Sequence, residues 1–155
     1  YTTNKKESMI AFYKTVVMNY LLKNGDAHLK NFGLLFDDDF KNIFYSPVYD
    51  VVNTVVYIHK DKPALMLDGK KIWHSKDTLI KFGQKSCLLS QSEANKYYKE
   101  CYEALIWAID ELENYLNEYP DFKIVKMMLD SWKLSLKEVS IKELDNDIIR
   151  TWKNY

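Results

Sequence analysis

The sequence is poor in arginine, cysteine and glycine, and each shortage narrows what the protein can be. Arg150 is the single arginine, which argues against a site built from several bidentate phosphate clamps. The cysteines, Cys87 and Cys101, are too few to staple a domain of 155 residues, and neither belongs to a Cys-x-x-Cys pair. We therefore expect reduced, packed thiols, which are typical of cytoplasmic proteins.

Long apolar runs and a net charge are also missing. No stretch approaches the roughly 18 residues of a membrane span, and no signal peptide is visible. Basic and acidic residues balance at 22 each, so the charge gives no reason to expect nucleic-acid binding. The sequence begins at Tyr1 rather than at methionine, and we expect it to be a piece of a longer chain. We predict a cytoplasmic protein without a membrane partner, with export as an effector left open.

The four glycines among 155 residues favour long helices. A wide apolar stripe predicts a helix over residues 7–23, buried on most sides and ended by Asn24-Gly25. Apolar stripes and capping signals predict further helices over residues 75–86, over 90–119, from Pro120 onward, and from Ser140 onward with Glu143 as its capping-box partner.

Between the first helix and the later ones, the apolar period shortens to that of strands. Residues 32–36 and 42–45 flank Asp37-Asp38-Asp39, which predicts a β-hairpin. Residues 64–73 contain Asp68-Gly69 between apolar runs, which predicts a second hairpin with a tight turn. The predicted fold is therefore mainly α, in the α+β class. It is a single domain over residues 1–155 with a small β insertion.

The segment Asp26-Ala27-His28-Leu29-Lys30-Asn31 follows the first helix, and its residue types suit phosphoryl transfer. This reaction needs a nucleophile held in line and metal ions that neutralise the phosphate oxygens. A carboxylate at Asp26, on a loop just past a helix end, can accept a hydroxyl proton. The amide oxygen of Asn31 is a hard ligand suited to Mg²⁺.

The first hairpin should carry Asp50 back beside Asn31. If Phe36 pairs with Ile43, the antiparallel register places Asn31 opposite about Val48, and Asp50 lies one or two residues beyond. Both side chains can then hold the same metal, since Mg²⁺ usually takes one or two carboxylates together with phosphate oxygens and water.

Each residue of this group also has a simpler interpretation. Asp26 could be an ordinary turn residue after a helix, and Asp50 could cap a following turn. His28 and Lys30 could meet negative charge that develops on the transferred phosphoryl group, but a lone histidine is more often a hydrogen-bonded structural residue than a ligand. The residues alone leave these alternatives open.

Three segments resemble the C-terminal lobe of the HipA-type serine/threonine kinases. These kinases are toxins of bacterial toxin–antitoxin modules and are distant relatives of the protein kinases and phosphoinositide kinases. The similar segments are NYLLKNGDAHLKNFGLL at residues 19–35, YSPVYDVVNT at 45–54 and ALMLDGK at 64–70. The helical remainder is compatible in length and order but carries little motif.

The resemblance implies a role for each site residue. Asp26 corresponds to the catalytic aspartate, Asn31 to the metal-binding asparagine, and Asp50 to the aspartate of the kinase Asp-Phe-Gly motif. Lys30 also fits the family pattern. Protein kinases commonly have a lysine two positions after the catalytic aspartate. This chain has His28 at that position, and the lipid kinases of the superfamily also have a histidine there. The implied cofactors are ATP and Mg²⁺, with Asn31 and Asp50 as the residues that hold them.

The resemblance further implies that ATP donates its γ-phosphoryl group to a serine or threonine of a protein. Translation factors such as a tRNA synthetase are known targets in the family, and a small helix-turn-helix antitoxin is an expected partner. The family's N-terminal lobe, its Gly-rich nucleotide loop and its regulatory phosphoserine loop have no counterpart in these residues. We therefore expect this lobe alone to bind ATP poorly.

Two other functions stay open. The missing nucleotide lobe is compatible with a non-catalytic, kinase-like module that recognises an antitoxin partner. The Asp-x-His spacing is compatible with a small-molecule or lipid phosphotransferase of the same superfamily.

Overall fold

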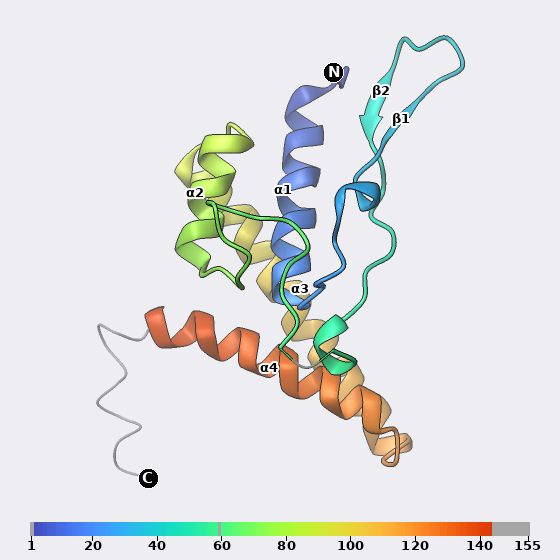
Figure 1. Cartoon of the computed structure of the whole chain (residues 1–155), viewed down its shortest axis with the longest axis vertical. Helices are drawn as coiled ribbons and strands as arrows, with labels where there is room; N and C mark the ends of the chain where they lie inside the picture. Colours follow the sequence, from blue (N-terminus) through green and yellow to red (C-terminus); the bar gives the residue numbers. More distant parts are fainter. Residues whose placement is uncertain (1, 59, 144–155) are drawn as a thin grey trace.

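A computed structural model describes residues 2–58 and 60–143 (Figure 1). The elements in chain order are α1 (Lys5–Leu21), the 3-10 helix η1 (Leu29–Asn31), β1 (Leu34–Phe36), β2 (Ile43–Tyr45), the 3-10 helix η2 (Thr54–Val56), α2 (Lys76–Ser86), α3 (Gln91–Glu118) and α4 (Lys123–Glu143). The structure is mainly helical with a small two-stranded antiparallel hairpin, which confirms the predicted fold class.

Helix α1 forms the centre of the molecule. Its consecutive residues Thr15, Val16 and Val17 are all buried, so the helix is covered on more than one side, as its wide apolar stripe predicts. The fully buried Tyr13 donates its hydroxyl to the backbone oxygen of Ala94 in α3 at 3.1 Å. Helix α3 also packs against α2 and α4, and α4 passes below the lower end of α1 and across the C-terminal part of α3 (Figure 1).

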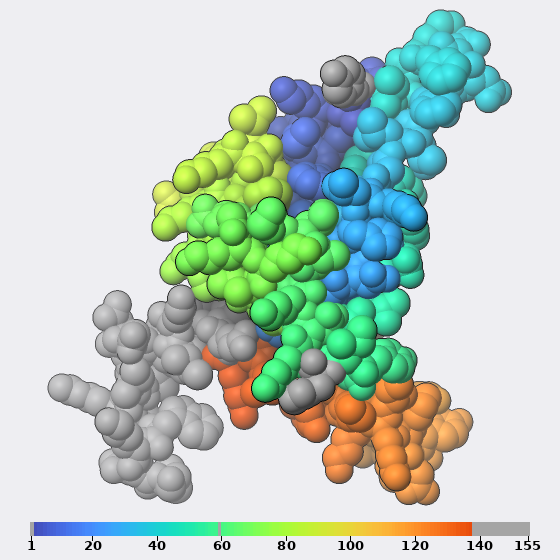
Figure 2. Space-filling model, in the orientation of Figure 1, coloured from blue at the N-terminus to red at the C-terminus, as the bar shows by residue number. Residues whose placement is uncertain are grey.

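The β1–β2 hairpin has the register that the sequence predicts. Phe36 pairs with Ile43, and the tip of the hairpin stands clear of the helices (Figure 2). Its base is fixed by aromatic packing, because the ring of Phe12 in α1 lies 5.7 Å from that of Phe32 and 5.8 Å from that of Tyr45. Edge-to-face aromatic pairs of this kind hold the hairpin at one angle to α1.

The capping box before α3 is present as predicted. The backbone N–H of Glu93 donates to the Ser90 hydroxyl at 3.2 Å, and the N–H of Ser90 donates to the Glu93 carboxylate at 2.8 Å. The ammonium of Lys6 donates to the same carboxylate at 2.5 Å, so the start of α3 is tied to α1. Chiefly because of this Lys6 hydrogen bond, the pKa of Glu93 falls to about 2.

The predicted second hairpin is wrong as a pair of strands, although its turn is correct. Asp68 and Gly69 both have positive φ, 50° and 73°, and Leu67 and Lys70 exchange backbone hydrogen bonds of 3.1 Å across them. The pairing stops there, because Leu67 packs against the helical core. A lone two-stranded ladder gains little stability in water.

Two predicted helix boundaries are wrong at the C-terminal end. Pro120 lies in the turn before α4 rather than in its first turn, and α4 continues through Ser140 to Glu143. One stripe of buried residues, which includes Val125, Leu129 and Trp132, faces the core, and the helix has no break at Ser140. The predicted last helix beyond Glu143 lies outside the described residues.

Cys87 and Cys101 are free and buried, as predicted. Burial raises the pKa of the Cys87 thiol to about 12 and that of Cys101 to about 11. In the described part of the chain, no helix combines the length and apolar character needed to cross a bilayer.

Candidate active site

The segment that carries Asp26 begins where α1 stops. Leu22 is the last residue with helical geometry, and Lys23 adopts the left-handed conformation with φ 58°. The sequence predicted the end of this helix at Asn24-Gly25, which is wrong by one residue. Asn24 and Gly25 continue into the interior, and Asp26 is the first exposed residue. The turn thus presents Asp26 to solvent from a buried base.

The buried amide of Asn24 links the two segments that carry the candidate carboxylates. Its nitrogen donates to Oδ1 of Asn19 at 2.8 Å and, over a longer 3.4 Å, to the backbone oxygen of Asp50. Its oxygen accepts the backbone N–H of Asp26 at 3.2 Å. One side chain that is 2% exposed therefore fixes the backbone at both Asp26 and Asp50.

Thr54 joins the same two segments a second time. Its hydroxyl accepts the backbone N–H of Gly25 at 2.8 Å, and its own N–H donates to the backbone oxygen of Lys23 at 3.2 Å. The Thr54 hydroxyl also donates to the carboxylate of Asp61. A β-carbon on Gly25 would lie 2.0 Å from Oδ2 of Asp61, so this close approach requires glycine.

Asn31 and Asp50 are in direct contact. The amide nitrogen of Asn31 donates to Oδ2 of Asp50 at 2.8 Å, and its oxygen accepts the backbone N–H of His28 at 3.1 Å. Asp50 itself has a left-handed backbone with φ 55°, which aspartate tolerates better than most residues. The hydroxyl of Tyr49 donates to the backbone oxygen of Lys30, which ties the two segments together beside this contact.

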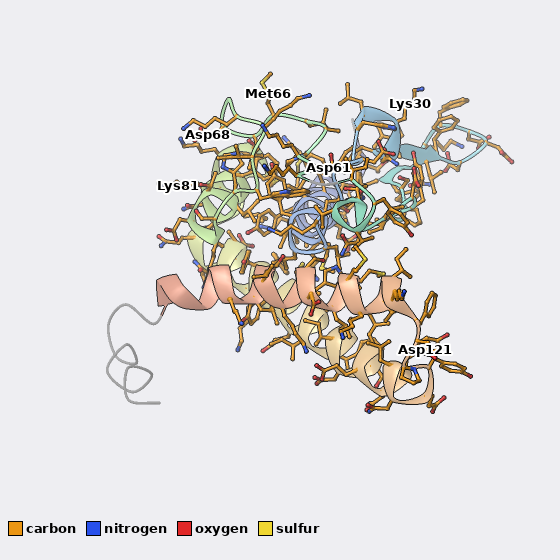
Figure 3. The ribbon with its side chains drawn as sticks, turned by 60° about the horizontal axis from the view of Figure 1, so that its bottom comes forward. Lys30, Asp61, Met66, Asp68, Lys81 and Asp121 are labelled. Carbon is orange, nitrogen blue, oxygen red and sulfur yellow. The ribbon has the colours of Figure 1, made fainter. Side chains whose placement is uncertain are left out.

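Asp26 and His28 lie together at the surface. Nε2 of His28 is 3.8 Å from Oδ1 of Asp26, which is too long for a hydrogen bond and forms an ion pair when the imidazole is protonated. The Asp26 side chain is 64% exposed and is open to an approaching hydroxyl group. Lys30 is exposed on η1, at the outer edge of the molecule (Figure 3).

The donor set fits a magnesium ion that shares its ligands with nucleotide phosphates. Within residues 2–58 and 60–143, no three His, Cys, Asp or Glu side chains gather into a metal-binding group, so these residues offer no complete cage. Mg²⁺ usually needs one or two carboxylates, with water and phosphate completing its shell. Asp50 is exposed, and its contact with Asn31 uses one of two carboxylate oxygens. The amide oxygen of Asn31 retains a second lone pair beside the one used by His28.

Of the five residues singled out in the sequence, four thus form two neighbouring pairs, and the fifth, Lys30, is exposed. Asn31 contacts Asp50, Asp26 lies beside His28, and the His28 backbone connects the pairs. Their catalytic and metal-binding roles stay predictions.

Sequence reasoning missed the supporting residues Asn24, Thr54 and Asp61. Asn24 was interpreted only as part of the signal that ends the first helix, and the sequence around Thr54 and Asp61 gave no reason to place either residue at the site. Their partners are distant in sequence, because Thr54 lies 29 residues from Gly25. The one available signal was a glycine at position 25, in a chain that otherwise uses few.

Comparison with known proteins identifies the family of the chain. Residues 1–109 match the family described as the HipA-like C-terminal domain. Two proteins of Sinorhizobium fredii, named "Putative kinase Y4dM" and "Putative kinase Y4mE", are each 36% identical to the chain, over 55 and 56 residues. Each match covers 36% of this chain and 13% of the relative, so it spans a small part of the relatives' length. Because the family match covers residues 1–109, more than half of the chain, the chain belongs to the family of HipA-like C-terminal domains.

Proposed function

We propose that the protein containing this chain is a serine/threonine kinase that uses ATP and Mg²⁺ to phosphorylate a protein hydroxyl. The observation that carries the proposal is the 2.8 Å contact between Asn31 and Asp50, beside a loop that exposes Asp26. Membership in the HipA-like family and the kinase names of two relatives support the same reaction class.

Asp26 is the proposed base. Its exposed carboxylate can accept a hydrogen bond from the acceptor hydroxyl, orient that oxygen and take its proton as the phosphoryl group transfers. Nε2 of His28, 3.8 Å away, can place positive charge beside the reacting groups when protonated. The hydrogen bonds of Asn24 and Thr54 support this role, because they hold the Asp26 segment before any substrate binds.

Asn31 and Asp50 are the proposed residues that hold Mg²⁺. The ion, when bound with ATP, neutralises charge on the phosphate oxygens. Asn31 is 6% exposed and is held on both sides, whereas Asp50 is exposed, so a rigid amide and an accessible carboxylate share the site. This combination suits a ligand that arrives from solvent together with a nucleotide.

A further lobe of the protein is proposed to complete the nucleotide site. Large apolar side chains along the hairpin, Leu34, Leu35, Phe36 and Phe44, are 45–57% exposed, which is the behaviour of a surface that another part of the protein covers. The small share of each relative that the matches cover supports a longer parent protein. An antitoxin partner, a translation-factor target and a cytoplasmic location stay predictions.

The test is transfer of label from γ-labelled ATP by the full-length protein, with protein, lipid and small-molecule acceptors offered in parallel. Asp26→Asn should lower the rate of protein labelling by about 10²–10⁴-fold. The matched control is Asp38→Asn, which removes an exposed carboxylate in the hairpin turn and should leave the rate unchanged. An unchanged labelling rate in Asp26→Asn would refute the assignment of Asp26 as the base. Labelling of lipids or small molecules but of no protein would refute the protein-kinase proposal and favour a lipid or small-molecule phosphotransferase.

A further inference from the structure

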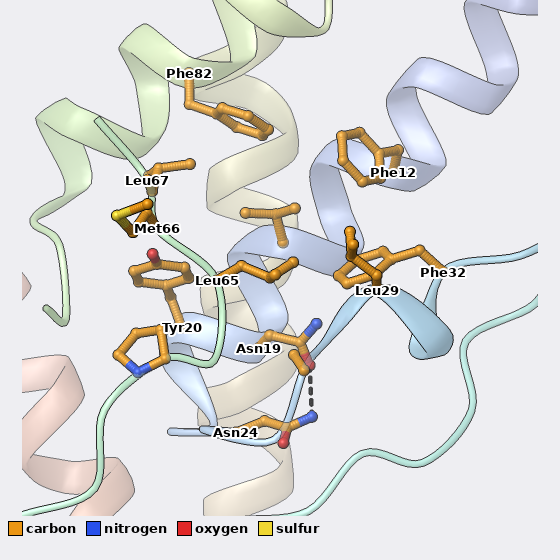
Figure 4. A pocket seen from close by; sticks show the side chains of 13 residues that line it. Phe12, Asn19, Tyr20, Asn24, Leu29, Phe32, Leu65, Met66, Leu67 and Phe82 are labelled. Carbon is orange, nitrogen blue, oxygen red and sulfur yellow. Dashed lines mark hydrogen bonds between the residues drawn. The ribbon is translucent and has the colours of Figure 1, made fainter. Parts of the chain in front are cut away.

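An apolar pocket of about 220 Å³ lies directly beside the catalytic segment (Figure 4). Ala27 and Leu29, the neighbours of His28, line one side of it. Leu65 and Met66, from the loop that follows η2, line another side. The reaction site and the pocket therefore share one short segment of chain.

The pocket offers almost nothing to a polar ligand. None of the residues that line it is charged. Its two amide side chains, Asn19 and Asn24, are bonded to each other at 2.8 Å, and the oxygen of Asn24 also accepts the backbone N–H of Asp26 (Figure 4). Tyr20, like any tyrosine, is neutral at physiological pH, and burial raises its pKa further, to about 12. Adenine would lose the hydration of its ring nitrogens here, whereas an apolar side chain loses nothing.

The volume suits a single large side chain. An apolar cavity of about 150 Å³ is sufficient to bind benzene, so this pocket admits leucine, methionine or phenylalanine. Leu29 and Met66, at its mouth, are 75% and 68% exposed, and Met66 projects outward in Figure 3. Covering these two side chains is favourable, and the flexible thioether of Met66 can adjust to occupants of different shape.

The distance to the proposed base restricts where the occupant sits in a substrate. Consecutive Cα atoms are about 3.8 Å apart, so the Cα of Leu29 lies within about 11 Å of that of Asp26. Ala27 is directly bonded to Asp26. An extended peptide covers the same distance in about three residues.

We infer that this pocket binds a leucine, methionine or phenylalanine side chain of the substrate protein, within three residues of the phosphorylated serine or threonine. The inference rests on the proposed kinase function and adds a substrate class to it. The pocket fixes the register of the substrate chain, so that the acceptor hydroxyl meets Asp26.

The experiment uses the full-length protein and peptides with one acceptor serine. A leucine or a glutamine is placed in turn at each of the three positions on either side of the serine. At one position the leucine peptide should have a kcat/KM at least about 10-fold above that of the glutamine peptide. Met66→Gln should reduce this ratio several-fold. The matched control is Met127→Gln, which replaces an exposed methionine on α4 and should keep the ratio.

The outcomes separate this inference from the function on which it rests. Transfer to peptides with equal kcat/KM at every position would overturn the inference and leave the kinase proposal standing. A Met66→Gln protein with an unchanged peptide ratio and a raised KM for ATP would assign the pocket to the nucleotide and also overturn it. Absence of transfer to every peptide and every protein acceptor would overturn both.

Discussion

Replacement of Asn24 by alanine should destabilise the chain and loosen both carboxylate segments at once. The amide of Asn24 makes hydrogen bonds of 2.8 Å to Asn19, 3.2 Å to the Asp26 backbone and 3.4 Å to the Asp50 backbone. Alanine removes all three and leaves Oδ1 of Asn19, a residue only 6% exposed, without its donor.

The size of the effect follows from these contacts. Each of the two shorter hydrogen bonds contributes about 1 kcal/mol net, and an unsatisfied buried oxygen costs about 1–3 kcal/mol. The bond of 3.4 Å adds little. The free energy of unfolding should therefore fall by about 3–5 kcal/mol, which for a chain of this length lowers Tm by roughly 6–20 °C.

Urea denaturation followed by circular dichroism measures the change directly. The matched control is Asn95→Ala on α3, where an exposed amide donates to the backbone of Gln91 one turn earlier. The control should change the free energy of unfolding by no more than about 0.5 kcal/mol. If Asn24→Ala were as stable as the control, the amide would not be the link between the two segments, and the explanation of how Asp26 and Asp50 are positioned would be wrong.

Two predictions concern titration. The folded pKa of Glu93, about 2, lies below its ordinary value of 4.5 because of Lys6, so the contact stabilises the fold above pH 4.5 and is lost as the pH falls toward 2. The free energy of unfolding measured in urea should therefore fall less steeply between pH 5 and 3 in Glu93→Gln than in the unmodified chain. The control Glu111→Gln, at an exposed site, should leave this slope unchanged. An unchanged slope in Glu93→Gln would refute this. Burial raises the pKa of Cys87 to about 12 and of Cys101 to about 11, so the free energy of unfolding should fall above pH 9. Iodoacetamide at pH 8 should modify both thiols of the folded protein slowly, as measured by mass spectrometry. Rapid modification of the folded protein would contradict their burial.

The parts of the site that depend on local pairing could be predicted from the sequence. Two apolar runs separated by a short acidic turn pair in one register, so Phe36 opposite Ile43 sufficed to return Asp50 to Asn31. The reciprocal bonds of Ser90 and Glu93 are equally local, because both partners lie within one helical turn.

The parts that depend on distant contacts could not be predicted. Gly25 supports the site by its closeness to Thr54 and Asp61, and no local pattern indicates that these three residues meet. Residues 64–73 have a hairpin pattern, but the partly buried Leu67 packs against the helical core, and the pairing is limited to one bridge between Leu67 and Lys70. The left-handed residue after α1 is Lys23 rather than the neighbouring Asn24 or Gly25, and both of these neighbours are buried.

The most direct test of the proposed phosphoryl-transfer site is the Mg²⁺ dependence of labelling by the full-length protein with Asp50→Asn. The substitution keeps the shape of the side chain and its contact with Asn31, and removes the negative charge. We predict a rate at least about 10²-fold below that of the unmodified protein at saturating ATP, with a requirement for higher Mg²⁺ concentrations, while Asp38→Asn behaves normally. Equal rates and equal Mg²⁺ dependence in Asp50→Asn and the unmodified protein would contradict the assignment of this carboxylate to the metal.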